Sequence, residues 1–367
     1  MTLNDNVLTY KQLFWLFLSM QVIMNMLLTP SGSIMIAQQD AWLSALIAIL
    51  ISLVTLWSSI KVCARYPSMD FHVIIETIAG KWIGRLLSIF LLVSFTVVLA
   101  VMLRQYGEFV SGTVLPKTPI SVIIFCILVT AIYPTFHGLG VIGRLAEIFG
   151  PILLLGIISP IILGIVNMDV KHLLPFWYDS GILAIITGSL GPAAFLTDCV
   201  LILWIFNLSE FHPNKIKYLT WSILTSGLLY LLSVTSIIAT FGVKIASTHL
   251  YPFLILERYI SIFGMIENLD AIVITVWILS IFLKICLYLF VTSYGFSMYT
   301  AKINRQKMVF YIAGIAFFLS LLPRNVVDIS IEFPQVVGVP FILPFWVILP
   351  LFLSLTIFIK DKINKTQ

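Results

Sequence analysis

Two ionisable side chains of opposite sign lie within strongly apolar stretches of this 367-residue chain. Lys284 is preceded by Ile281-Phe282-Leu283 and followed by Ile285-Cys286-Leu287, and Asp198 lies six residues after Pro192. A charge at membrane depth is costly, and it normally faces a partner or a water-filled cavity. Lys284 is therefore expected to line a central cavity, where it either pairs with Asp198 or contacts the carboxylate of a bound substrate.

Three interpretations of Asp198 stay open. Its carboxylate could contact a substrate amine, hold a proton or cation, or belong to a structural hydrogen-bond network. Tyr288 lies four residues after Lys284, so a helix would place both side chains on one face. The Tyr288 hydroxyl is able to hydrogen-bond a ligand, and simple packing of the ring is the alternative.

Two apolar segments are interrupted at matching places in the two halves of the chain. Segment 13–36 contains Thr29-Pro30-Ser31-Gly32, and segment 182–208 contains Gly188-Ser189-Leu190-Gly191-Pro192. Each proline leaves the carbonyl four residues earlier without its helical donor. Within a bilayer, such carbonyls are tolerated only inside the protein or beside a cavity. Paired interruptions of this kind predict a solute site near the middle of the membrane.

Four further polar residues are candidates for the same site or its entrance. Asn25 offers an amide about one turn before the first interruption. Ser94 is a polar position in an apolar segment, where a hydrogen bond to the preceding turn is the bland alternative. Arg104 and Glu108 have the i, i+4 spacing of an ion pair, which could also act as a gate.

No pattern of residues indicates catalysis or a cofactor. The sequence contains neither HExxH nor CxxC, and its four cysteines have no metal-type spacing. No Ser/His/Asp or Cys/His set falls at one membrane depth. The GxGxxG match at 138–143 joins two apolar segments instead of following a strand, so it predicts a tight turn and no nucleotide site. We therefore expect no enzyme activity, no metal site and no cofactor.

The composition is that of an all-α polytopic membrane protein. Hydrophobic residues make up 60% of the chain, charged residues 10%, and the mean hydropathy is +1.09. A membrane-spanning helix needs about 20 mostly apolar residues. Ten apolar segments are predicted to span the membrane: 13–36, 42–62, 86–112, 118–136, 141–167, 182–208, 218–242, 268–298, 308–323 and 339–359.

The distribution of basic residues predicts the orientation of these spans. With the N-terminus inside, 14 of the 21 Lys and Arg residues fall on the inner side and five on the outer side. Both termini, 1–10 and 361–367, are then cytoplasmic. The ten helices divide into an inverted repeat of five plus five, about 11–168 and about 182–360, in a single transmembrane domain.

Three connecting segments carry further expectations. The inner segment 63–85 is predicted to contain a short amphipathic helix at the membrane interface. The outer segment 243–267 is long enough to act as a lid. Residues 320–339 form another outer connection.

A series of short motifs runs along nearly the whole chain in a specific order. They are Thr29-Pro30, Asp40-Ala41-Trp42, Arg65-Tyr66-Pro67-Ser68, Gly80-Lys81-Trp82-Ile83-Gly84, Arg104 with Glu108, Thr118-Pro119-Ile120, Arg144, Glu267 with Asp270, and Val276-Trp277-Ile278. In this order the chain resembles the B subunit of nutrient germinant receptors. These are spore germination proteins of the amino acid–polyamine–organocation (APC) transporter superfamily, which has the LeuT-like fold.

The resemblance implies a receptor in the inner membrane of the spore, working with a larger A subunit and a lipoprotein C subunit. It implies a small germinant, such as an amino acid, as ligand. The family's pocket, carried over to this chain, comprises Ile23, Asn25, Ser94, Leu196, Lys284 and Tyr288. This chain departs from the family at Ile23 and Asn25, where glycine is common, and at Lys284, where a neutral residue is usual.

Two functions therefore remain as hypotheses. The first is a sensor subunit that binds a germinant in mid-membrane and signals to its partners. The alternative is a proton-coupled amino-acid permease, in which Lys284 or Asp198 takes the place of a sodium ion.

Overall fold

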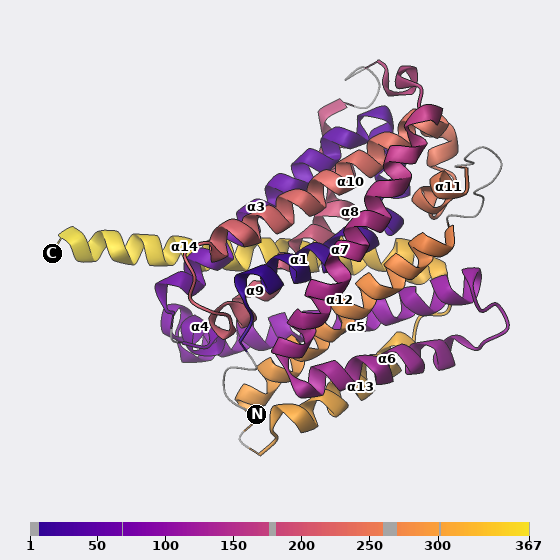
Figure 1. The fold of residues 1–367 in the computed structure, drawn as a ribbon. Helices are drawn as coiled ribbons and strands as arrows, with labels where there is room; N and C mark the ends of the chain where they lie inside the picture. The colour runs from indigo at the N-terminus through magenta and orange to yellow at the C-terminus, as the bar shows by residue number, and fades with distance from the viewer. Residues whose placement is uncertain (1–6, 68, 176–180, 260–269, 301, 367) are drawn as a thin grey trace.

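The chain forms a bundle of long helices in the computed structural model, which describes residues 7–67, 69–175, 181–259, 270–300 and 302–366 (Figure 1). Within these residues there is no β-strand, and the one β-type pairing is an isolated bridge between Leu8 and Ser209. The predicted all-α class is confirmed.

The first apolar segment is interrupted where the sequence predicts. Helix α1 (Tyr10–Leu28) ends before Thr29, and helix α2 (Pro30–Ala37) begins with Pro30. Proline fits the first position of a helix, where its missing N–H has no role. The Thr29 hydroxyl donates to the backbone and side-chain oxygens of Asn25, at 2.8 and 2.7 Å. This closes the end of α1 over its own last turn.

The sixth apolar segment departs from α-helical geometry later than predicted. Helix α8 (Gly181–Leu196) runs through Gly188, Gly191 and Pro192, and the 3₁₀ segment η5 (Thr197–Leu201) follows it. The prediction of a break at 188–192 was therefore wrong in position. The Ser33 hydroxyl donates to the Gly188 carbonyl at 2.6 Å and replaces the N–H that Pro192 lacks. The helix continues because α2 satisfies this carbonyl.

The remaining elements of the first half follow the predicted spans. They are η2 (Gln38–Asp40), α3 (Ala41–Arg65), α4 (Phe71–Ala79), α5 (Lys81–Thr113), α6 (Ile120–His137), α7 (Leu139–Gly164), η3 (Ile165–Asn167) and η4 (Val170–Leu173). Helix α4 is the predicted short helix of segment 63–85, and it buries one apolar face. Gly138, the first residue of the GxGxxG stretch, forms the turn between α6 and α7 with a φ of 114°, and residues 139–143 begin α7.

The second half continues after η5 with one structural surprise. Its other elements are α9 (Ile202–Ile205), η6 (Phe206–Leu208), α10 (Lys215–Ala246), α11 (Pro252–Tyr259), α12 (Asp270–Tyr299), α13 (Arg305–Ser320), the π-helical η7 (Asp328–Glu332) and η8 (Pro334–Ile342), and α14 (Leu343–Thr366). The second part of the expected outer connection 320–339 is helical, because η7 and η8 extend α14 as wide π-helical turns. The expected lid, 243–267, contains α11, but its residues 260–267 lie outside the described part.

Nine helices of the described chain are long and apolar enough to cross a membrane. The predicted count of ten is not confirmed by this criterion. The difference is α13, whose 16 residues extend about 24 Å against a hydrocarbon thickness of about 30 Å. The chain is nonetheless a multi-pass membrane protein by its many apolar helices.

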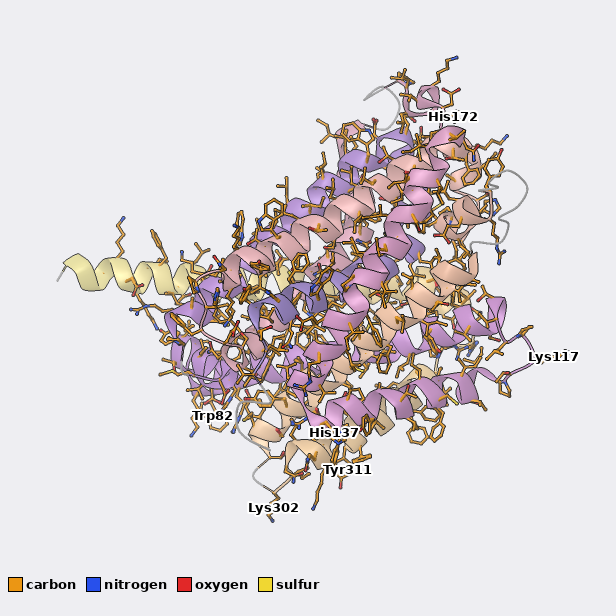
Figure 2. The ribbon with its side chains drawn as sticks, viewed as in Figure 1. Trp82, Lys117, His137, His172, Lys302 and Tyr311 are labelled. Carbon is orange, nitrogen blue, oxygen red and sulfur yellow. The ribbon has the colours of Figure 1, made fainter. Side chains whose placement is uncertain are left out.

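The two halves interleave, and this places the charged residues at the centre. Helix α1 packs against α10 and α12 of the second half, and α8 packs against α2 and α3 of the first. Helix α12, which carries Lys284, also contacts α5, α6 and α7. Figure 2 shows Lys117 and His172 towards one end of the bundle, and Trp82, His137 and Lys302 towards the other. We call these the Lys117 end and the Lys302 end.

Candidate ligand-binding site

A cavity of about 430 Å³ lies beside the first helix break, with Asp198 and Lys284 among its lining residues. Most of its wall comes from α2, α5, α8, η8 and the start of α14, and α1, η5, α12 and η7 each contribute one residue. The other described residues that line it are Leu28, Thr29, Gly32, Ser33, Met35, Ile36, Val98, Val101, Met102, Gln105, Thr187, Gly188, Leu190, Gly191, Ala194, Phe195, Ser330, Phe333, Pro334, Gln335, Gly338, Val339, Ile342, Leu343 and Trp346. Its volume falls within the range of about 300–1,000 Å³ that is typical of small-molecule sites.

Three buried side chains form a polar group at this cavity. The Lys284 ammonium makes an ion pair with Asp198 Oδ2, and both side chains are almost fully buried. The Tyr288 hydroxyl donates to Asp198 Oδ1 at 2.5 Å. The ammonium also lies 5.1 Å from the ring centroid of Phe195. The structure therefore brings Asp198 into contact with Lys284 and Tyr288, although Asp198 and Tyr288 are 90 residues apart in the sequence.

Four predicted ligand residues lie behind the cavity lining. Each contacts either a lining residue or a residue of α1. Asn25 is buried and accepts from Thr29, which lines the cavity. Ser94 accepts from the indole N–H of Trp346 at 2.9 Å, and donates to Leu91 O.

Leu196 and Tyr288 also lie behind the cavity lining. Leu196 is fully buried, and its carbonyl accepts from Gln21 of α1 at 2.9 Å. Tyr288 is fully buried and reaches the cavity only through Asp198. The side chain of Ile23, the remaining predicted residue, lies outside the described part of the structure.

Some of the predicted break residues line the cavity and others are buried away from it. Thr29, Gly188 and Gly191 line the cavity, whereas Pro30 and Pro192 are buried without lining it. Gly188 lies at a close contact between helices. A Cβ built on it would be 2.9 Å from Ser44 Oγ and 3.0 Å from Ala37 Cβ.

Sequence reasoning missed the apolar side of the cavity. Phe195, Phe333 and Trp346 bring aromatic rings to its wall, and Gln105 and Gln335 bring amides. Phe195 and Gln105 had a local signal, because they lie one turn from Asp198 and next to Arg104. Residues 330–342 gave none, since a π-helical extension has no recognisable sequence period.

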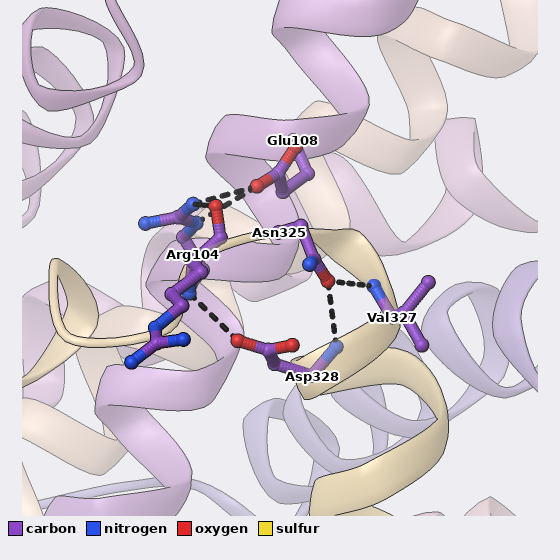
Figure 3. A network of polar contacts seen from close by, with 6 residues as sticks. Arg104, Glu108, Asn325, Val327 and Asp328 are labelled. Atoms are coloured by element: carbon purple, nitrogen blue, oxygen red, sulfur yellow. Dashed lines mark hydrogen bonds and ion pairs between the residues drawn. The ribbon is translucent and has the colours of Figure 1, made fainter.

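Arg104 and Glu108 form the predicted ion pair on α5, where Arg104 is next to the cavity-lining Gln105. The guanidinium contacts Glu108 Oε1 at 2.8 and 2.9 Å. Arg104 also donates to the Arg324 carbonyl at 3.3 Å, and the Arg324 N–H donates to Asp328 Oδ2 at 2.8 Å (Figure 3). The pair thus anchors the start of η7, whose neighbours close one side of the cavity.

The described residues of the site do not form a metal centre. Among the residues that the structure describes, no group of three or more His, Cys, Asp or Glu could hold a metal ion. The arrangement provides one paired cation and one paired anion beside an apolar cavity, which suits binding.

Comparison with known proteins supplies the family. Residues 7–329 match the family described as "Spore germination protein". The chain belongs to the spore germination protein family. Several curated relatives carry the same description.

Three relatives illustrate the extent of this similarity. Spore germination protein KB of Bacillus subtilis (strain 168) is 26% identical over 360 residues, which cover 97% of this chain and 95% of the relative. Spore germination protein YndE of the same strain is 25% identical over 295 residues, 80% of each chain. Spore germination protein GerLB of Bacillus cereus is 24% identical over 299 residues, 79% of this chain and 78% of the relative.

The fold is that of a transporter. A substrate-bound, outward-open Na⁺-coupled sialic acid symporter superposes with a TM-score of 0.59, covering 86% of this chain and 72% of the symporter. The sequence identity is 12%, so the likeness concerns the fold alone. It confirms the LeuT-like architecture predicted for this germination protein.

Proposed function

We propose that this chain is the ligand-binding membrane subunit of a nutrient germinant receptor. The observation that carries the proposal is the cavity of about 430 Å³ at the first helix break, in a chain of the spore germination family. A germinant, such as an amino acid, binds there and favours one of two arrangements of the bundle. Its differential affinity for the two arrangements supplies the signal.

The proposal includes location and partners. The chain lies in the inner membrane of the spore, with both termini on the core side, as the basic residues favour. It acts with an A subunit and a lipoprotein C subunit. The segment from Arg324 to Ile342 is the element suited to relay binding, because it lines the cavity and is held by Arg104 at its start.

A proton-coupled amino-acid permease is the second candidate. The transporter fold and the buried Lys284–Asp198 pair favour it. Ionisable residues inside a membrane often pair with one another and mark ion pathways or proton relays, and in this candidate function Lys284 or Asp198 takes the place of a sodium ion.

One paired phenotype separates the two. Spores of a strain that lacks this chain are tested for germination, by loss of optical density, on a panel of single nutrients. Growing cells of the same strain are tested for uptake of the same nutrients, and uptake is compared between cells that express the chain and cells that do not. Loss of germination on one nutrient with unchanged uptake establishes the receptor. Normal germination with altered uptake establishes the permease.

A variant links the phenotype to the cavity. Lys284→Ala is expected to abolish or retune the response while the protein still accumulates in the membrane. Lys217→Ala, an exposed lysine on α10, serves as the matched control. An unchanged nutrient preference in Lys284→Ala would place the lysine outside the site.

A further inference from the structure

The two charges at the cavity are not equivalent as ligand contacts. Both oxygens of Asp198 are engaged, Oδ1 by the Tyr288 hydroxyl and Oδ2 by Lys284. A ligand amine on this carboxylate would compete with the Lys284 ammonium for it and would bring a second positive charge beside the lysine. Leaving a buried donor or charge unpaired is strongly unfavourable.

Lys284 differs from Asp198 because its ammonium has N–H donors that are not used by its ion pair. An ammonium group carries three N–H donors and no acceptor. In the described part of the chain, its one polar partner is Asp198, and its other close contact is the face of the Phe195 ring. Lys284 lines the cavity, so its remaining donors are available to an oxygen atom of a ligand there.

The charge of the cavity limits the net charge of that ligand. Lys284 and Asp198 cancel each other, and none of the other described lining residues is a Lys, Arg, Asp or Glu. A ligand with net charge would bring an uncompensated ion into an apolar site, which is costly. A zwitterion or an uncharged molecule avoids this cost.

The walls limit the shape of the ligand. On α5 the lining runs from Val98 through Met102 to Gln105, which is about 10 Å along the helix. Phe333, Ile342 and Trp346 face the same space from the other wall. This surface suits a bulky apolar group and offers few polar partners to a long charged one.

We infer that this site takes a net-neutral amino acid with a bulky apolar side chain, whose carboxylate is bound by Lys284 while Asp198, held by Tyr288, remains the fixed counter-ion of the lysine. The inference rests on the proposed function and adds the ligand class and the separate roles of the two charges. Asp198 is then a positioning residue, and Lys284 is the ligand contact.

The test measures binding to the purified full-length chain in nanodiscs by calorimetry. The probes are L-valine, L-leucine and L-phenylalanine, with glycine, L-lysine and L-glutamate for comparison. At least one of the first three is expected to bind more tightly than every member of the comparison set. The inferred ligand class is overturned if none of the three binds, or if glycine, L-lysine or L-glutamate binds at least as tightly as the tightest of them.

The role of Lys284 is tested with the amide of the tightest amino acid, which lacks the carboxylate. The wild-type chain is expected to bind the amide at least about tenfold more weakly, as the loss of a charge-assisted hydrogen bond predicts. In Lys284→Met this preference for the acid should disappear or reverse, because the amide is a cation and Asp198 has lost its counter-ion, and Lys217→Met should behave as wild type. Equal binding of acid and amide to the wild type, or undiminished preference for the acid in Lys284→Met, overturns the assignment.

A gain of binding tests the role of Asp198. In Asp198→Asn, Lys284 loses its counter-ion, so 4-methylpentanoate, a carboxylate without an amine, should bind more tightly than it does to wild type. Weaker binding of amines such as 3-methylbutylamine, with no gain for the carboxylate, would show that Asp198 binds the ligand amine. The spore phenotype is independent of these measurements, so a receptor with a different binding mode would still lose its germination response on deletion.

Discussion

At the scale of single residues, the buried ion pair dominates the chemistry of this protein. Lys284 and Asp198 are 1% and 2% exposed, and Tyr288 is fully buried beside them. Removing one member of a buried pair leaves an uncompensated charge and costs about 3–5 kcal/mol, whereas replacing both can be nearly neutral. The two charges therefore depend on each other for stability as well as for binding.

A double-mutant cycle measures this dependence. Asp198→Asn and Lys284→Met are each expected to lower the thermal stability of the protein in detergent, and the double variant should be more stable than Asp198→Asn alone. The readout is the unfolding midpoint, followed by intrinsic fluorescence. Losses that simply add would argue against the pair.

Gly188 offers a second prediction at this scale. An added methyl group would meet Ser44 Oγ and Ala37 at 3.0 Å or less, so Gly188→Ala should destabilise the protein by about 1–3 kcal/mol through overpacking. Gly191 is the matched control, because nothing lies within 4 Å of its added Cβ. Gly191→Ala should retain or slightly raise the unfolding midpoint, since alanine favours a helix. Equal losses in both variants would contradict the close contact.

At the scale of elements, the contact between α5 and the segment before η7 controls one wall of the cavity. Arg104 holds the Arg324 carbonyl, and Asn325 and Asp328 close the turn that follows. The wide turns of η7 and η8 carry Ser330, Phe333 and Gln335 to the cavity. π-helical turns often occur at functional sites, and here they set the position of the lining.

Arg104→Gln is therefore expected to loosen this wall. It removes the ion pair with Glu108 and the bond to the Arg324 carbonyl, so amide hydrogen exchange should become faster over residues 325–335. Arg85→Gln is the control, because its pair with Glu76 is 3.9 Å long and partly exposed. Unchanged exchange over 325–335 in Arg104→Gln would exclude an anchoring role.

At the scale of the whole molecule, residues that are predicted on opposite sides of the membrane lie at opposite ends of the bundle. Lys117 and His172 lie towards one end, and Trp82, His137 and Lys302 towards the other, as the predicted topology requires (Figure 2). The excess of basic residues on the Lys302 side favours its cytoplasmic location.

Cysteine labelling tests this orientation. In a Cys126→Ser background, which removes the one exposed native thiol of the described chain, Lys117→Cys should react with an impermeant maleimide in intact cells. Lys302→Cys should react only after the membrane is permeabilised. The reverse pattern would invert the topology, and with it the side from which the cavity is reached.

The sequence by itself determined the membrane class, the first helix break and the three residues that form the polar group. These depend on local properties: apolar length, the missing N–H of Pro30, and the rarity of charge in apolar stretches. Even so, the sequence left open whether Lys284 pairs with Asp198, because nothing local measures the distance between segments so far apart.

Tertiary structure decided the rest. The second break moved to η5 because Ser33, from another helix, satisfies the carbonyl that Pro192 leaves free. The cavity wall of residues 330–342 came from packing of η7 and η8 against α5 and α8, and not from any local period. Asn25, Ser94, Leu196 and Tyr288 were predicted to face the ligand, and each lies behind the lining instead. Which face of a buried helix meets a cavity is decided by its neighbours, because an apolar helix shows no polar stripe to mark it.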